Sequence, residues 1–407
     1  MQTLWTVGYV IGEIPSNMIL TRVRASYWIP ALEVVWTILT FCTSRCNTAE
    51  QLYAVRFFVG LAESGFYPGM QYLIGSWYRK DELAKRSCIF HTCSAVASMF
   101  SGYLMAAVYH LEGTGGFRGW QVSIERLQAE AYPDSGQWLF LVDGIISLPI
   151  ALLGFLFLPD MPETTRAWYL TPEEKAFAVK RMQLEGRKGR EPYTRAKFKK
   201  IFSSWHIYAL TVLYITFNNG GSAAAPVFAQ YLKRSKHPKY EIWQINVYPT
   251  TTYAVAVVTT LAYAWSSDTF LRGARWPPMI FGASMNIITC ASLAYWDIPV
   301  HWKWACYILA GCGSGLSGLC FAWAHEICAD DNEERALVTA TMNEMAYVFQ
   351  AWLPLIIWQQ VDAPRYRRGF VGGSVISALL IVTAFVTRFL HKRDIGHKET
   401  VSSDDDS

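Results

Sequence analysis

The stretch "RFFVGLAESGFYPG", residues 56 to 69, holds an arginine and a glutamate among residues that are mostly apolar, aromatic or glycine. On a helix, Arg56, Gly60 and Glu63 share one face because they are four and then three residues apart. A charge in the middle of a membrane helix costs about 2.5 to 3.5 kcal/mol on insertion scales, so it needs a partner or water. Gly60 leaves room for a substrate or for another helix. The pattern therefore predicts either a binding site or a structural salt bridge to another span.

Amide side chains occur in two further apolar stretches. Asn218 and Asn219 lie in "FNNGGSAAAP", residues 217 to 226, where two glycines and a proline weaken the helix. Asn343 and Gln350 are seven residues apart in the stretch 341 to 358, so they share a helix face. Interrupted helices of this kind commonly line transport sites. The amides are thus candidate substrate ligands, with hydrogen bonding between packed helices as the alternative.

Composition indicates what kind of element must hold these side chains. The chain has 407 residues, 52% of them hydrophobic and only 17% charged, against roughly 25% charged in soluble proteins. A bilayer core requires about 20 apolar residues per helix. The sequence has eleven runs of about this length, which predict an all-α membrane protein: 1 to 20, 27 to 43, 51 to 76, 87 to 110, 138 to 158, 205 to 231, 244 to 265, 277 to 296, 302 to 325, 336 to 358 and 369 to 390.

The distribution of basic residues predicts the orientation. Lys and Arg collect on the cytoplasmic side of membrane proteins. One alternating set of loops, which includes 159 to 204 and the C-terminal tail, holds 24 Lys and Arg residues, and the other set holds 11. We therefore expect the long loop and the C-terminus to be cytoplasmic. The net charge of +4 then follows from topology, and nucleic-acid binding is not needed to explain it.

The chain divides into two similar halves. We expect an N-terminal bundle at 1 to 158, a cytoplasmic linker at 159 to 204, a C-terminal six-helix bundle at 205 to 390 and a cytoplasmic tail at 391 to 407. Polar loops recur at one offset, as with Arg86 and Arg335, which are 249 residues apart. Such duplicated halves place a transport site near the midplane between them.

Two irregularities accompany this division. Equal halves would require twelve spans, so eleven predict that the first helix is missing. Residues 122 to 137 interrupt an otherwise continuous apolar pattern with a polar segment whose ends can be written with intron-like codons. We expect a retained intron there, and the alternative is an ordinary extracellular loop.

Several kinds of chemistry lack sequence support. The nine cysteines contain no CxxC spacing and the eight histidines no HxxxH or HExxH, so no metal site is expected. The glycine-rich "GCGSGLSG" lacks the GK[ST] of a nucleotide loop. We find no nucleophile and base pair. The sequence therefore predicts neither an enzyme nor a cofactor.

The turn "SDTFLRGAR", which contains Asp268, Arg272 and Arg275, resembles the cytoplasmic latch of the major facilitator superfamily. In the first half, Thr21 or Asn17 stands where an acid is expected, so that latch is predicted to be weaker or free of acid. "RFFVGLAESGFYPG", "WYRKDELAKR" and "PDMPETTRAWYLTPEE" resemble the fungal anion:cation symporter branch, or allantoate permease family. "LWTVGYVIGEIPSNMILTRVR" and "NEERALVTATMNEMAYVFQ" are most similar to its yeast-type pantothenate transporters.

This resemblance implies a fold of two pseudo-symmetric six-helix bundles that carries a small organic carboxylate with protons across the plasma membrane. Arg56 would attract the carboxylate and Glu63 would exchange the proton. The predicted substrate-binding set is Arg56, Tyr67, Asn218, Asn219, Asn343 and Gln350. Pantothenate is the first expectation for the substrate. Allantoate, biotin, nicotinate or a dipeptide remain open, as does a non-transporting sensor or an inactive truncated form. The expected partners are the substrate, protons and the lipid bilayer, with the protein a monomer.

Overall fold

The computed structural model describes residues 2–43, 45–46, 48–110, 137–184, 194–221, 224–235 and 237–405. Throughout these residues the regular structure is helical, with no strand. The retained-intron hypothesis concerns residues 122 to 137, of which 122 to 136 lie outside the described part of the chain.

Each of the eleven apolar runs coincides with helical structure. Seven runs form single helices: α1 (Gln2–Leu20), α2 (Ala25–Thr43), α5 (Lys80–His110), α6 (Gln137–Phe157), α13 (Trp276–Tyr295), α17 (Asn332–Ile357) and α18 (Arg367–Asp405). Four runs are interrupted: α3 (Ala49–Glu63) with α4 (Phe66–Trp77), α9 (Trp205–Gly221) with α10 (Ala224–Arg234), α11 (Ile242–Val247) with α12 (Thr250–Asp268), and α14 (Val300–Leu309) with α15 (Gly311–Ser314) and α16 (Ser317–Ile327). A short 3-10 helix, η3 (Gln360–Asp362), precedes α18.

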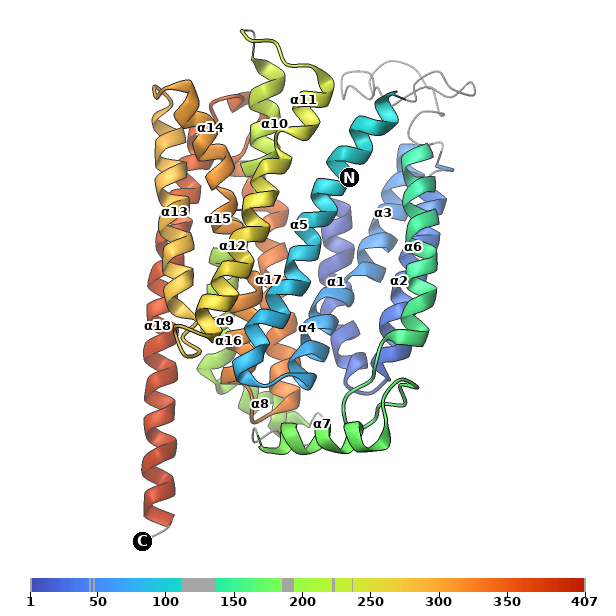
Figure 1. The fold of residues 1–407 in the computed structure, drawn as a ribbon, viewed down its shortest axis with the longest axis vertical. Helices are drawn as coiled ribbons and strands as arrows, with labels where there is room; N and C mark the ends of the chain where they lie inside the picture. The colour runs from blue at the N-terminus through green and yellow to red at the C-terminus, as the bar shows by residue number, and fades with distance from the viewer. Residues whose placement is uncertain are drawn as a thin grey trace.

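The helices form two halves that lie side by side (Figure 1). Helix α5 of the first half packs along α12 of the second, and α1 packs along α17. The largest cluster of buried apolar residues crosses this boundary, since it joins Leu83, Ala84 and Cys88 of α5 to α9 and α16. The linker helices α7 (Pro172–Leu184) and α8 (Arg195–Ser203) lie at one end of the bundle, which we call the linker side. Positive charge predicts that this side is cytoplasmic.

The surface has the character of a membrane protein. Large apolar side chains such as Ile145, Leu156, Val258, Leu355 and Phe389 are each at least 60% exposed. Exposing this much apolar surface to water is unfavourable, whereas the acyl chains of a lipid bilayer can cover it. By length and composition alone, four segments could cross a bilayer: Ala25–Thr43, Trp276–Tyr295, Val300–Ile327 and Arg367–Gly396. The count of eleven spans stays a prediction.

Helix α7 of the linker has a side-chain cap at its first turn. Thr171 caps α7 by accepting a hydrogen bond from the amide of Glu174 at 3.3 Å, and the Glu174 carboxylate accepts one from the Thr171 amide at 2.8 Å. This reciprocal capping box lowers the pKa of Glu174, because its ionised form is the better acceptor. The linker thus contains a helix with a capped first turn.

The kink between α3 and α4 determines where Glu63 lies. Pro68 and Gly69 are the residues of this stretch that usually bend a helix, but the break occurs one turn earlier, at Ser64 and Gly65. Helix α1 approaches so closely that a Cβ atom on Gly65 would lie 1.9 Å from the Ser16 hydroxyl. Pro68 falls in the first turn of α4, where its missing N–H costs no hydrogen bond. Glu63 is therefore the last residue of α3, directly at the kink.

Gly60 provides room for a helix. A Cβ atom on Gly60 would lie 2.1 Å from the backbone oxygen of Trp5, and one on Gly8 would lie 2.1 Å from that of Phe57. The two glycines thus let α1 and α3 touch backbone to backbone, as small residues do at membrane helix contacts. Of the two uses that the sequence left open, the described structure supports helix packing.

Gly60→Ala should therefore destabilise the protein. Overpacking costs about 1 to 3 kcal/mol, which the better helix propensity of Ala offsets by about 1 kcal/mol. The apparent melting temperature of the detergent-solubilised protein should fall. Gly396→Ala is the matched control, because nothing lies within 4 Å of its Cβ position, and it should leave the melting temperature unchanged or raise it. A melting temperature that is equal in both variants would contradict the close α1–α3 contact.

Candidate functional site

A central cavity of about 360 Å³ lies between the two halves. Its walls come from α1, α3, α4 and α5 of the first half and from α9, α12, α15 and α17 of the second. Aromatic rings form much of the lining: Tyr9, Phe66, Tyr67, Tyr214, Phe217, Tyr253 and Tyr347. Its other polar groups include Glu63, His91, Asn218 and Asn343. The cavity thus suits a small molecule with an apolar body and hydrogen-bonding ends.

Four of the predicted site residues line this cavity, namely Glu63, Tyr67, Asn218 and Asn343. The Glu63 carboxylate accepts a hydrogen bond from the Trp5 indole N–H at 2.9 Å. The Asn343 amide donates to the Tyr9 hydroxyl at 3.1 Å. Within the described residues, the buried amide nitrogen of Asn218 has no hydrogen-bond partner. A buried donor without a partner is costly, so Asn218 is available to a ligand.

The other three predicted binding residues are not part of the cavity lining. Arg56 lies about two turns from Glu63 along α3, toward the end opposite the linker side, and acts on Glu63 electrostatically. The Asn219 amide donates to the backbone oxygens of Ile215 at 3.0 Å and Ala346 at 3.3 Å, so it joins α9 to α17. Gln350 has a buried side-chain oxygen without a hydrogen-bond partner in the described residues. Their substrate-binding roles stay predictions.

A hydrogen-bonded chain that the sequence did not reveal joins the halves beside the cavity. The Tyr67 hydroxyl lies 2.8 Å from the Ser317 hydroxyl and 3.1 Å from Nδ1 of His91. The Tyr214 hydroxyl lies 3.0 Å from the same serine. His91 is a histidine within the apolar run 87 to 110, and this is the sequence feature that could have identified it as a site residue. It is the cavity-lining residue in the described part that can carry a positive charge.

The turn predicted to form the latch of the second half contacts the first half, and its role as a latch stays a prediction. Asp268 forms an ion pair with Arg275 and accepts a hydrogen bond from the backbone N–H of Lys85, on the other half, at 3.1 Å. Arg275 also binds Glu326 at 2.6 Å. Arg272 is instead exposed, with a φ of 49°, and shapes the corner of the turn.

The first half has the corresponding contact without an acid. The Asn17 amide donates to the backbone oxygen of Ala336 at 2.8 Å, across the boundary between the halves. Asn17 and Asp268 are separated by 251 positions, and so are Lys85 and Ala336, within two residues of the 249 positions between Arg86 and Arg335. The two contacts therefore lie at similar places in the two halves. The first half was predicted to have a latch that is weaker or free of acid, and the contact made by Asn17 contains no acidic side chain.

Arg335 strengthens the same boundary and was not among the predicted site residues. It is 2% exposed, and it donates to the backbone oxygen of Gly75 at 3.3 Å and to the Ser76 hydroxyl at 3.0 Å. These acceptors lie at the C-terminal end of α4, where a cation is favoured by the helix dipole. Together with the two latches, Arg335 joins the halves on the linker side of the cavity.

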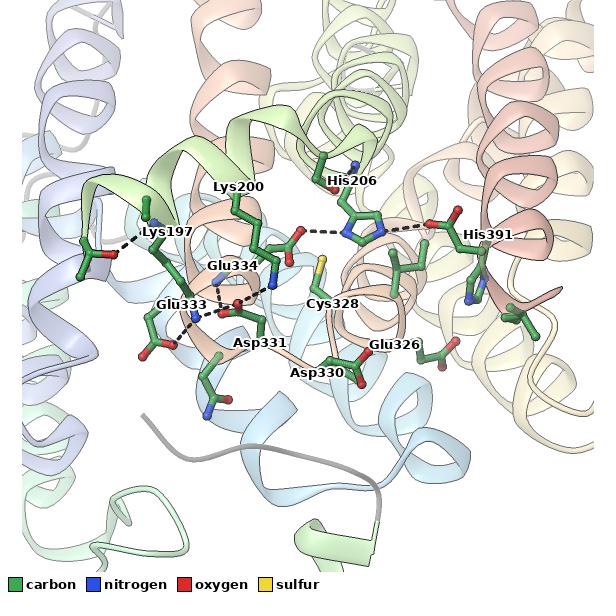
Figure 2. Close-up of a pocket in the computed structure, with 18 residues that line it drawn as sticks. Lys197, Lys200, His206, Glu326, Cys328, Asp330, Asp331, Glu333, Glu334 and His391 are labelled. Atoms are coloured by element: carbon green, nitrogen blue, oxygen red, sulfur yellow. Dashed lines mark hydrogen bonds and ion pairs between the residues drawn. The ribbon is translucent and has the colours of Figure 1, made fainter. Parts of the chain in front are cut away.

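A second cavity, of about 720 Å³, lies on the linker side, where it is lined mainly by charged groups (Figure 2). Lys197 of α8 binds Asp331 at 2.8 Å and Glu333 at 3.7 Å. Burial alone would raise the pKa of Asp331, but the hydrogen bond and charge of Lys197 outweigh it, so the pKa lies below its usual range. This cavity therefore marks the place where the linker is docked on the second half.

Three residues of this second cavity have the chemistry of metal ligands. His206, Cys328 and Glu334 place one ligand atom each within 4.8 Å of one another. However, Nδ1 of His206 is already hydrogen-bonded to Glu334 at 2.7 Å, so the arrangement is explained without an ion. We assign no metal to it.

Comparisons with known proteins agree with this architecture. The family model described as Major Facilitator Superfamily matches residues 1–354. The chain is 33% identical to the pantothenate transporter liz1 of Schizosaccharomyces pombe over 403 residues, which is 98% of this chain and 74% of that protein. It is 29% identical to the pantothenate transporter FEN2 of Saccharomyces cerevisiae, over 90% of this chain and 70% of that protein. A crystal structure of the transporter FucP in the outward conformation superposes with a TM-score of 0.69 at 11% identity, covering 95% of this chain and 88% of that one.

Asp331→Asn should loosen the docking of α8. Asn keeps the helix cap that Asp331 gives to Glu334 but loses the charge that holds Lys197. A hydrogen bond between charged groups contributes about 2 kcal/mol, so tryptic cleavage at Lys197 should accelerate by about 30-fold, as read by mass spectrometry. Because the pKa of Asp331 is lowered, its contribution is present above about pH 4 and is lost only below it, so docking should be equal at pH 6 and pH 8.

Lys200→Ala is the matched control for this experiment. Lys200 lies 3.9 Å from the same carboxylate, but its side chain is 72% exposed, and such pairs contribute at most about 1 kcal/mol. Cleavage at Lys197 should hardly change. Equal acceleration in the two variants would mean that the buried ion pair does not dock the linker.

Proposed function

Since the chain belongs to the major facilitator superfamily, we propose that it takes up a small organic carboxylate together with protons across the plasma membrane, with pantothenate as the first expectation. The named relatives are transporters and not enzymes. Their substrate, pantothenate, carries a single carboxylate, an amide and hydroxyl groups on an apolar carbon skeleton. The aromatic walls and scattered hydrogen-bonding groups of the central cavity are compatible with such a molecule.

The observation that carries this proposal is the position of Asn218. Its amide nitrogen is buried, lines the central cavity and lacks a hydrogen-bond partner among the described residues. A substrate carboxylate or carbonyl would supply the missing acceptor, and the Tyr67 hydroxyl and His91 lie in the same cavity. These groups discriminate between substrates by hydrogen bonding, which aromatic walls alone do not.

Arg56 has a different part in this proposal. No lysine or arginine is among the residues that line the cavity in the described part of the chain. Arg56 lies on the same helix as Glu63, toward the side opposite the linker. There its permanent charge would draw the anion toward the cavity before the amides and hydroxyls bind it.

Alternating access would follow from the contacts between the halves. The latches at Asp268 and Asn17, together with Arg335, hold the halves together on the linker side. Release of the substrate into the cytoplasm would require these contacts to break. Since they are hydrogen bonds to backbone groups at helix ends, the halves could exchange them without repacking their own cores.

Proton coupling is assigned to Glu63. It lines the cavity at the kink between α3 and α4, so its carboxylate is within reach of both substrate and water. A non-transporting sensor is the second candidate, but a cavity of about 360 Å³ between the two halves, large enough for a small molecule, favours a carrier.

The substrate class can be tested by competition. Uptake of radiolabelled pantothenate by yeast cells that lack their own carrier should be inhibited by monocarboxylates of similar size and not by hexoses. Asn218→Ala should raise KM by about tenfold, since one hydrogen bond to a charged group is worth about 1.5 kcal/mol or more. Inhibition by hexoses without inhibition by carboxylates would exclude the proposed class.

Glu63→Gln should separate coupling from binding. The amide keeps the size of the carboxylate but does not titrate, so accumulation driven by a pH gradient should be abolished while exchange of substrate across the vesicle membrane persists. Arg56→Lys keeps the charge but loses the planar fork, so exchange and accumulation should fall together. Should Glu63→Gln vesicles still concentrate substrate under an imposed gradient, Glu63 is not the coupling residue.

A further inference from the structure

Glu13 is a buried acid in the middle of α1 for which the proposed function gives no role. Its side chain is 0% exposed, and in the described part of the chain neither carboxylate oxygen has a hydrogen bond of good geometry. The neighbouring donor is the side-chain amide of Asn343, which already donates to the Tyr9 hydroxyl. Glu63, by contrast, accepts a hydrogen bond from Trp5. An ionised carboxylate buried without a positively charged partner is strongly disfavoured, whereas a neutral carboxyl group is tolerated.

The position of Glu13 connects the cavity with the linker-side contacts. Tyr9, Glu13 and Asn17 are spaced by four residues, so they form one stripe along α1. Both neighbours in this stripe bind α17, since Tyr9 accepts from Asn343 in the cavity and Asn17 donates to the backbone of Ala336. Glu13 therefore lies in the α1–α17 contact, between the cavity and the latch.

Among the described residues, no positively charged group acts on Glu13. From α17, Asn343, Glu344 and Tyr347 face it, and from α1 itself Tyr9 does. From α3, Glu63 acts on the same two tyrosines. Helix α4, which also packs on α1, contains no Asp, Glu, Lys, Arg or His. Any negative charge on Glu13 would thus add to those of two nearby acids.

We propose that Glu13 is a proton-binding site of the transport cycle, which holds its proton while the linker side is closed and releases it when α1 separates from α17. The inference rests on the proposed transport function and adds a second proton site to it. Opening of the linker side would bring water to Glu13, where the carboxylate is stable, and the proton would leave to the cytoplasm. Closing buries Glu13 again, so a proton must first return to it from the water on the same side, and the closed linker side and the protonated Glu13 favour each other.

The test follows the opening of the linker side without any substrate. Ala336 is 1% exposed and packs against Leu20 and Tyr72 of the first half, so Ala336→Cys reports separation of the halves there. Inside-out vesicles are treated with a water-soluble maleimide between pH 5.5 and 8, and labelling of that peptide is measured by mass spectrometry. Lys200→Cys, at a side chain that is 72% exposed, corrects for the pH dependence of the reagent.

Corrected labelling at Ala336→Cys should rise by at least about threefold from pH 5.5 to 8, because deprotonation favours the open state. Adding Glu13→Gln, which is neutral at every pH, should abolish this rise. Glu33→Gln is the matched control, because Glu33 is a partly buried acid on α2, which makes no major contact with α17, and the rise should persist.

The proposal is overturned if labelling with native Glu13 does not depend on pH, a result that needs no Glu13 variant to fold. It is also overturned if Glu13→Gln leaves the pH dependence intact. Because the assay contains no substrate, failure of pantothenate uptake would overturn the proposed function without affecting this result. A protein that transports a carboxylate but labels equally at all pH values would overturn Glu13 alone.

Discussion

Polar side chains near the linker side of each half form hydrogen bonds with backbone and side-chain groups of the other half. Arg335 finds acceptors on α4, Asp268 finds a backbone donor on α5, and Asn17 finds a backbone acceptor on α17. In an apolar environment a buried polar group without a partner is costly, so these contacts are worth more than equivalent contacts in water. The contacts between the halves are also reversible, because they consist of hydrogen bonds that water can replace. When water enters between the halves it offers replacement partners, and the contacts can open at little net cost.

Close approach of helix backbones makes this arrangement possible. Gly8 and Gly60 bring α1 against α3, and Gly65 brings α1 against the kink that follows Glu63. The second half repeats the device, since Gly315, in the break between α15 and α16, would collide with Thr260 if it had a side chain. Kinks at related places in both halves put polar side chains at helix ends beside the cavity, where the backbone has unpaired groups of its own.

Much of this could be predicted from the sequence, because apolar runs of bilayer length determine helices and polar residues within them are rare. That reasoning found Glu63, Tyr67, Asn218 and Asn343, which the fold brings to one cavity. It could not place Asn219, because helical periodicity gives the face of a residue but not the helix that covers it. Nor could it foresee that Arg335, noted as a repeat landmark, would cross between the halves. Those partners depend on tertiary packing alone.

Glu13 was missed for a different reason. It is the single charged residue of α1, so the energetic argument that singled out Glu63 applies to it equally. The structure separates the two acids by their partners. Glu63 accepts a hydrogen bond from an indole, lies on the same helix as Arg56 and lines the cavity. Glu13 has no such donor or cation, and it lies where the halves must part. An acid at the cavity wall suits proton exchange beside the substrate. An acid that can be charged only when water reaches it suits the step that links proton release to opening.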